Sequence, residues 1–179
     1  MILFYHENSM LSKEILLAEE EAKHCLKVLR MHIGDCLYLT DGKGNLAEVT
    51  IISDTIKKCV VQVKNCLYYP KKHTHRIHIA IAPTKNADRM EWFVEKCVEI
   101  GVDEISFLHT EHTERSFFND DRMLKKAISA MKQSLNFHLP ILNPIQNLSN
   151  FFDKTTKLSP STTQLFMAYV DKDLSLIHI

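Results

Sequence analysis

The sequence has few of the residues that interrupt regular structure and no excess of charge of either sign. Its 179 residues include four glycines and five prolines, and 22 basic residues balance 22 acidic ones. This composition excludes collagen-like and low-complexity chains, and a 45% share of hydrophobic residues suffices for a packed core. A formal net charge of zero also removes the bulk positive charge typical of nucleic-acid-binding domains. Any contact with RNA or DNA must come from a local group of basic side chains.

Several chemical signatures are absent as well. The five cysteines form no C-x-x-C pair, so the sequence predicts neither a disulfide framework nor a zinc knuckle. No G-x-G-x-x-G, G-x-x-x-x-G-K-[ST] or G-x-S-x-G motif occurs, which removes the main support for dinucleotide-binding, P-loop and hydrolase enzymes. The chain lacks a signal-peptide pattern and any apolar run of the roughly 18 residues that a membrane span requires. We therefore expect a cytoplasmic protein.

Before about residue 70, the chain has the pattern of a small β-rich unit. Alternating or β-branched runs predict strands at 37–40, 47–52 and 59–63, and the glycine-containing stretch 41–45 predicts a hairpin turn. One helix interrupts these strands and ends near Arg30. Its apolar face carries four residues at helical spacing: Ala22, Cys25, Leu26 and Leu29.

After the polar segment 70–75, which we interpret as a linker, predicted strands alternate with predicted helices. Strands are expected at 76–82, 105–108, 141–142 and 164–170, the first of them buried on both faces. Helices are expected from about residues 88, 121 and 148. Asp88 and Glu91 resemble a capping box that starts the first of these helices, and Gly101 predicts its end. Strands separated by helices imply a parallel sheet with right-handed crossovers, and hence an α/β fold.

Basic side chains follow two of these strands. Lys85 and Arg89 come after the first strand, and Arg115 comes after the second. The carboxyl ends of parallel strands meet at one edge of a sheet, so these three side chains are candidates for a shared cationic edge that holds phosphates. The alternative is that they form ordinary surface ion pairs with Glu91, Glu111 or Glu114.

Other groupings are weaker. The histidine pair at 109 and 112 and the histidines at 73, 75 and 78 lack the further ligands that a metal site needs, so we predict no metal. A helix face from Arg122 to Lys132 is basic and is interpreted as a solvated face, with a phosphate-tracking surface as the alternative.

Five segments in order resemble the motif series of the bacterial 16S ribosomal RNA uracil-N3 methyltransferases. Each segment alone is weak, but their order across about 120 residues is specific to that family. The segments are His24-Cys25-Leu26-Lys27-Val28-Leu29-Arg30 with Gly34-Asp35, Lys85-x-x-Asp88-Arg89-Met90-Glu91, Lys96-x-x-Glu99-Ile100-Gly101-Val102, Thr113-Glu114-Arg115-Ser116, and Ala130-Met131-Lys132-Gln133-Ser134 with Pro140.

The resemblance implies an enzyme of two domains that transfers a methyl group from S-adenosylmethionine to N3 of a uridine in 16S rRNA. Residues 1–70 would form a PUA-like β-barrel that helps to grip RNA, and residues 71–179 part of a SPOUT-type methyltransferase domain. Family members are homodimers, and no membrane partner is implied. When the family's motifs are carried over by position, the barrel motif contains His24 and Arg30. The sheet edge contains Lys85, Arg89 and Arg115, and a helix motif contains Gln133. All six are expected to face RNA, and no catalytic base is assigned.

The sequence departs from the family in two places. Leu135-Asn136-Phe137 stands where relatives often carry Arg or Lys, and the Gly-Pro-Glu-Gly-Gly loop of the cofactor-binding knot does not occur. Residues after about Asp173 do not match the family either. We therefore expect a truncated methyltransferase whose cofactor site lies outside these residues, and no measurable binding of S-adenosylmethionine. The resemblance then gives less reason to expect the homodimer. The alternative is a non-catalytic RNA-binding module. Both readings require the basic side chains to gather on one RNA-facing rim.

Overall fold

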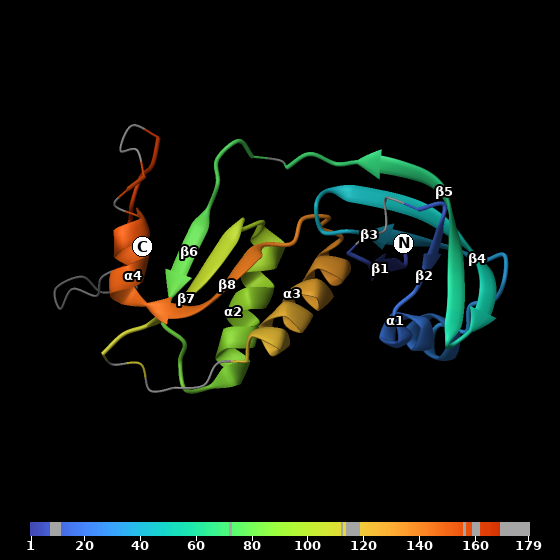
Figure 1. Cartoon of the computed structure of the whole chain (residues 1–179), viewed down its shortest axis with the longest axis horizontal. Helices are drawn as coiled ribbons and strands as arrows, with labels where there is room; N and C mark the ends of the chain where they lie inside the picture. Colours follow the sequence, from blue (N-terminus) through green and yellow to red (C-terminus); the bar gives the residue numbers. More distant parts are fainter. Residues whose placement is uncertain are drawn as a thin grey trace, which may run out of the picture.

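The computed structural model describes residues 1–7, 12–71, 73–111, 113, 119–155, 157–158 and 162–168. A five-stranded sheet, in the order β1-β3-β4-β5-β2, lies in the N-terminal half (residues up to 71), and a three-stranded sheet, in the order β6-β7-β8, lies in the C-terminal half (Figure 1). Within the described part of the chain, no helix is both long enough and apolar enough to cross a membrane.

The N-terminal sheet is built on a long antiparallel hairpin of β4 and β5, with β3 antiparallel to β4 and the short β1 parallel to β3. Its elements are β1 (Leu3–Tyr5), β2 (Glu14–Leu16), α1 (Glu19–Lys23), η1 (His24–Val28), β3 (Cys36–Thr40), β4 (Asn45–Thr55) and β5 (Lys58–Tyr68). The three predicted strands and the hairpin turn are confirmed, although β4 and β5 are longer than expected. β1 and β2 were not predicted because three residues are too few to show a period.

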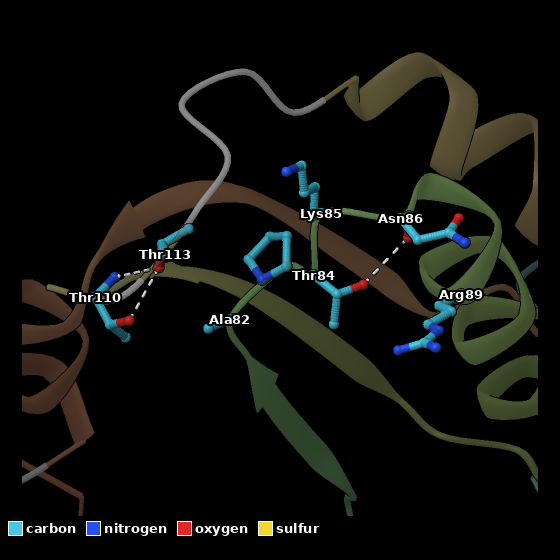
Figure 2. Close-up of a pocket in the computed structure, with 8 residues that line it drawn as sticks. Ala82, Thr84, Lys85, Asn86, Arg89, Thr110 and Thr113 are labelled. Atoms are coloured by element: carbon cyan, nitrogen blue, oxygen red, sulfur yellow. Dashed lines mark hydrogen bonds between the residues drawn. The ribbon is translucent and has the colours of Figure 1, made fainter.

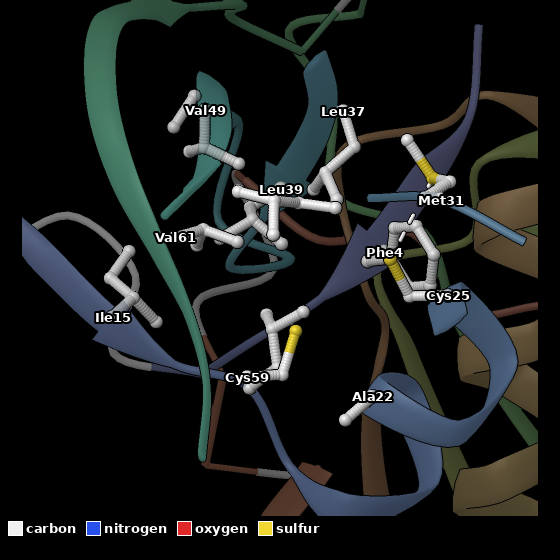
Figure 3. Packing of buried hydrophobic residues seen from close by; sticks show 13 residues of the cluster. Phe4, Ile15, Ala22, Cys25, Met31, Leu37, Leu39, Val49, Cys59 and Val61 are labelled. Atoms are coloured by element: carbon white, nitrogen blue, oxygen red, sulfur yellow. Dashed lines mark hydrogen bonds between the residues drawn. The ribbon is translucent and has the colours of Figure 1, made fainter. Parts of the chain in front are cut away.

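Alternate residues of these strands point into one apolar core (Figure 3). Phe4, Leu37, Leu39, Val49 and Val61 are all fully buried there. A strand with one buried face shows this alternation, which is why the sequence pattern identified β3, β4 and β5.

The predicted helix is present, but its second half is wound as the π-helix η1. Ala22 and Cys25 are buried as expected, and burial raises the pKa of the Cys25 thiol to about 12. Leu29, however, is 37% exposed, so its assignment to the core was wrong. A π-helix has more residues per turn than an α-helix, so Leu29 turns away from the expected face, whereas Leu26 still packs against the core as predicted.

The C-terminal half alternates strands and helices as predicted. Its elements are β6 (His78–Ile81), α2 (Ala87–Ile100), β7 (Glu104–His109), α3 (Asp120–Ser134), β8 (Ile141–Asn147) and α4 (Leu148–Thr155), and all three strands are parallel. α2 and α3 pack side by side on one face of the sheet, and α4 follows β8 at the carboxyl ends of the strands (Figure 1). Buried side chains from α2, α3 and β7, among them Val94, Met131 and Phe107, form the second core.

Three predictions in this half need correction. β6 is an edge strand of the described sheet and only its helix-facing residues pack into the core, so it is not buried on both faces. Residues 164–168 form no strand, and the remainder of that predicted strand lies outside the described residues. The start of α2 is set by Asn86, whose side-chain oxygen accepts a 2.8 Å hydrogen bond from the Asp88 amide, and not by a capping box of Asp88 and Glu91. Gly101, with a φ of +85°, ends α2 as predicted.

A junction joins the two halves through backbone contacts, made by the β3–β4 turn and the loop that follows α3. The Gly44 amide donates to the Phe137 carbonyl and the Leu139 amide donates to the Gly42 carbonyl, each at 2.8 Å. Beside them, Lys132 of α3 forms an ion pair with Glu21 of α1 at 2.7 Å. These contacts fix the orientation of the N-terminal sheet relative to α3.

Candidate functional site

A hollow of about 650 Å³ lies at the carboxyl ends of β6 and β7 (Figure 2). The connection from β6 to α2 forms one wall, and the loop after β7 forms the other. Its lining residues are Ala82, Pro83, Thr84, Lys85, Asn86, Arg89, Thr110 and Thr113. This is the edge at which open parallel sheets collect ligands.

The first wall is ordered by short polar contacts. The Thr84 hydroxyl donates to the Asn86 carbonyl at 3.1 Å, and Asn86 in turn caps α2. Lys85 therefore lies just before the helix and Arg89 lies in its first turn, with Thr84 between them in Figure 2. The fixed turn places both cations in the lining of the hollow, on either side of Thr84 (Figure 2).

The second wall consists of Thr110 and Thr113, which sequence reasoning missed. The Thr110 amide donates to the Thr113 hydroxyl at 2.7 Å, and the two hydroxyls are 2.9 Å apart. These residues follow the predicted second strand. The rule that ligands gather at the carboxyl ends of parallel strands, which singled out Lys85, therefore also applied to their loop. Threonine was not singled out because an uncharged hydroxyl in a loop carries no distinctive signal. Arg115 lies outside the described residues.

No ion pair joins Lys85 or Arg89 to a carboxylate within the described part of the chain. Glu91, which was considered as a partner, forms an ion pair with Arg122 instead. The two cations are exposed and remain available to a ligand. Because the amino end of α2 also favours negative charge, an anion is the ligand that this hollow suits best.

The basic face of α3 is different. Arg122 pairs with Glu91 and Asp88, and Lys126 pairs with Glu95, so these two residues link α3 to α2. The other basic residues of α3 pair with α1: Lys125 with Glu20 at 3.6 Å and Lys132 with Glu21 at 2.7 Å. This face is neither a plain solvated face nor a free phosphate track, because each of its cations has an acidic partner.

The other predicted RNA-facing residues do not line the hollow. The exposed His24 on η1 makes an edge contact with the Phe4 ring, with 5.6 Å between centroids, and Arg30 follows η1 with a left-handed φ of 54°. Gln133 is exposed near the end of α3. In Figure 1, α1 and η1 lie on the opposite side of α3 from the β6–α2 connection. Lys85 and Arg89 therefore both line the hollow, whereas His24, Arg30 and Gln133 do not, so the described residues do not form the single RNA-facing rim that the sequence predicted.

The histidines do not build a metal site among the described residues, where no group of three or more potential ligand side chains occurs. His78 is instead part of a polar network on the sheet, in which its Nε2 lies 2.9 Å from the Ser106 hydroxyl. Burial lowers the pKa of His78, and the neighbouring Glu104 carboxylate opposes that shift. This network lies near the amino ends of the strands, away from the hollow.

Two family models match the chain. The RNA methyltransferase domain matches residues 70–178, which includes most of the segment after Asp173 that we expected to differ, and the RNA methyltransferase PUA domain matches residues 17–64. A curated relative, ribosomal RNA small subunit methyltransferase E of Buchnera aphidicola, is 26% identical over 137 residues, which are 73% of this chain and 54% of the relative. The chain thus spans about half the length of that relative.

Solved structures give the same result. A probable rRNA methyltransferase from Porphyromonas gingivalis is 41% identical with a TM-score of 0.84, over 96% of this chain and 70% of the other. A putative methyltransferase from Legionella pneumophila, solved with S-adenosylmethionine bound, is 26% identical with a TM-score of 0.76, over 86% of this chain and 66% of the other. Since the methyltransferase-domain match alone covers more than half of the residues, the chain belongs to the RNA methyltransferase family.

Proposed function

We propose that this chain is the RNA-gripping part of an S-adenosylmethionine-dependent enzyme that methylates N3 of a uridine in 16S rRNA. Its relatives named as rRNA methyltransferases support the reaction class, and the curated relative's name supports the small-subunit rRNA as substrate. We assign residues 1–70 to a PUA-like barrel and residues 71–179 to part of a SPOUT-type domain, acting in the cytoplasm.

The observation that carries the RNA contact is the pair of cations at the hollow. Lys85 and Arg89 both line the hollow and have no acidic partner among the described residues, whereas the four basic residues of the neighbouring α3 are all paired. Phosphate oxygens are the partners that such a pair recognises, and phosphate contacts fix the position of RNA on a protein. The threonine hydroxyls of the other wall add donors for phosphate or ribose oxygens.

The described residues of the hollow do not fit S-adenosylmethionine. Its reactive sulfonium is positively charged, and Lys85 and Arg89 would stand beside it as like charges with no carboxylate among the described lining residues to offset them. We therefore assign the hollow to RNA and derive no step through the cofactor there.

The phosphate contacts made by Lys85 and Arg89 serve the proposed reaction by positioning the substrate. They hold the RNA so that an unstacked uridine is displayed to the methyl donor, and positioning of this kind supplies a large part of the rate. The N3 proton must also leave, and we assign no residue to that step.

Analysis of 16S rRNA from cells tests this function. We expect nucleoside mass spectrometry to show loss of 3-methyluridine when the gene is disrupted and recovery when it is restored. Unchanged 3-methyluridine after disruption would contradict the proposed activity. For the 179-residue chain itself, we expect calorimetry to detect no binding of S-adenosylmethionine, and a saturable micromolar site would overturn that part.

A non-catalytic RNA-binding module is the second candidate. It is favoured by the same observation that the hollow suits RNA and does not suit the cofactor. This candidate predicts salt-sensitive binding of RNA by the chain together with unchanged 3-methyluridine in the disrupted strain. The cell experiment therefore separates the two functions.

A further inference from the structure

Four aromatic rings gather at the junction of the two halves, far along the fold from the hollow. We call them the junction aromatic cluster: Tyr68 and Tyr69 at the end of β5, and Phe137 and His138 in the loop after α3. The Tyr69 and Phe137 rings are 4.8 Å apart between centroids. The Tyr68 and His138 rings both come within 3 Å of the point where a Cβ of Gly44 would lie, at 2.9 and 2.6 Å. Tyr69 and Phe137 therefore form one ring pair, and the rings of Tyr68 and His138 flank Gly44.

The backbone holds this cluster rigidly. The Tyr69 amide donates to the Gly44 carbonyl at 2.7 Å, and the Gly44 amide donates to the Phe137 carbonyl at 2.8 Å. The His138 ring nitrogen Nε2 donates to the Tyr69 carbonyl at 2.8 Å, and Lys43 pairs with His138 in an isolated β-bridge. A backbone fixed in this way loses little conformational entropy when a ligand covers the rings.

The rings are displayed to solvent beside a positive charge. Tyr68 is 64% exposed and Tyr69 is 41% exposed. Lys43, on the turn beneath them, is exposed and forms no ion pair with the described residues. The nearest carboxylate in the turn, that of Asp41, is buried and accepts hydrogen bonds from the Lys43 amide and the Asn45 side chain.

Exposed aromatic faces next to a lysine are the elements of a surface that stacks unpaired bases and contacts their phosphates. We infer that the junction aromatic cluster binds single-stranded RNA through base stacking, with Tyr68 as the principal platform. The partner class rests on the proposed function. The cluster lies beside the carboxyl ends of α2 and α3, where Asn136 bonds the Val98 carbonyl, whereas the hollow lies at the amino end of α2. The 14 residues of α2 span about 20 Å, so the cluster contacts nucleotides that flank the one at the hollow.

Binding of two probes separates stacking from electrostatic attraction. The probes are a fluorescein-labelled 12-nucleotide single-stranded RNA and a 12-base-pair RNA duplex, each titrated with the whole chain by anisotropy. We expect Tyr68→Leu to weaken single-strand binding about 5-fold or more while duplex binding and the salt dependence stay unchanged. Tyr68→Phe keeps the ring and should bind like the wild type. Trp92→Leu is the matched control, because Trp92 on α2 is 63% exposed and lies outside the cluster.

Equal single-strand affinity of Tyr68→Leu and the wild type would overturn the inference, as would an equal loss in Trp92→Leu. A change in molar mass by light scattering on Tyr68→Leu would also overturn it and assign the cluster to self-association.

If Tyr68→Leu does not fold, ultraviolet cross-linking of the wild-type chain to the single-stranded probe decides. Peptides containing Tyr68 or Phe137 are expected to carry RNA, and their absence among cross-linked peptides refutes the role of the cluster. If the wild-type protein binds neither probe, the proposed RNA contact is refuted as a whole. If RNA binding is weakened by neutralising Lys85 and Arg89 but is unchanged in Tyr68→Leu, only the role of the cluster is refuted.

Discussion

The junction and the hollow contain similar residue types in opposite situations. At the junction, Lys132 is paired with Glu21, and backbone amides of each half donate to carbonyls of the other; Lys125 of α3 is paired with Glu20 of α1 in the same way. At the hollow, Lys85 and Arg89 face open space and no described carboxylate. This difference shows that residue type alone does not identify which basic residues of this chain bind a ligand. Whether the fold supplies an acidic partner decides whether a basic residue holds the protein together or remains free for a ligand.

The largest expected effect breaks the junction at a glycine. Gly34 and Gly44 have nearly the same φ, +95° and +96°, but a Cβ on Gly44 would lie 2.7 Å from the Tyr69 carbonyl oxygen whereas one on Gly34 would meet nothing within 4 Å. Both alanine variants bear the cost of a left-handed backbone, about 1–3 kcal/mol. Gly44→Ala adds the clash, and we expect a further loss of about 1–3 kcal/mol in the free energy of unfolding. Urea denaturation of both variants measures this, and equal losses would show that the junction tolerates the side chain.

The next effect breaks the hollow and leaves the fold intact. We expect the double variant Lys85→Gln/Arg89→Gln to bind single-stranded RNA roughly 10- to 100-fold more weakly, because two charge-assisted contacts to phosphate are lost. Its midpoint of unfolding should not change, since neither side chain has a described partner. The control is Lys23→Gln/Lys125→Gln, which removes the same charge from two exposed lysines of α1 and α3 that are paired with Glu19 and Glu20. Similar weakening in both double variants would mean that net charge, and not the hollow, attracts RNA.

A smaller effect depends on pH and involves the segment that connects the halves. Asp103 is buried, which by itself raises its pKa, but hydrogen bonds from Lys71 and from the Ile77 amide at 2.8 Å outweigh burial and hold the pKa of Asp103 below its usual 3.8. A lowered carboxyl pKa stabilises the fold above about pH 4 and loses that contribution as the pH falls through the folded-state pKa. We expect Asp103→Asn to cost about 1–2 kcal/mol at pH 7.

The check is the same pair of proteins unfolded by urea at several pH values. The difference between wild type and Asp103→Asn should stay constant from pH 7 to pH 5 and shrink below pH 3.8. A difference that persists unchanged at pH 2.5 would show that the carboxylate charge contributes nothing.

The smallest effect concerns one exposed ion pair between α1 and α3. Lys125 and Glu20 are both largely exposed and 3.6 Å apart, so solvent screens their attraction. Lys125→Gln should change the free energy of unfolding by less than about 0.5 kcal/mol. A loss above 1 kcal/mol by urea denaturation would show that this pair is a main link between the halves.

Local patterns predicted much of the fold and part of the site. Alternation along β3, β4 and β5 reflects a single buried face, and the order of strands and helices implied the parallel sheet, which in turn placed Lys85 and Arg89 at its carboxyl edge. The N-cap was missed because Asn86 and Asp88 are both good capping residues two positions apart, and only coordinates show which oxygen reaches the amide.

Contacts between distant segments could not be predicted in this way. Gly44 and Phe137 are far apart in sequence, and neither residue alone signals a partner. The acidic partners of the α3 cations lie on α1 and α2, so a periodicity argument made on α3 alone could only describe that face as solvated or phosphate-binding. The exposure of Leu29 follows from a π-turn that no helical period anticipates.

The salt dependence of RNA binding tests the central claim most directly. Each phosphate contact on a single strand adds about 0.7 to the slope of log affinity against log salt concentration. We predict that Lys85→Gln/Arg89→Gln has a slope shallower than the wild type by about 1.4, whereas Lys23→Gln/Lys125→Gln keeps the wild-type slope because its two lysines are paired with Glu19 and Glu20 and lie outside the hollow. Equal slopes for the wild type and Lys85→Gln/Arg89→Gln would contradict the assignment of the hollow to RNA phosphates.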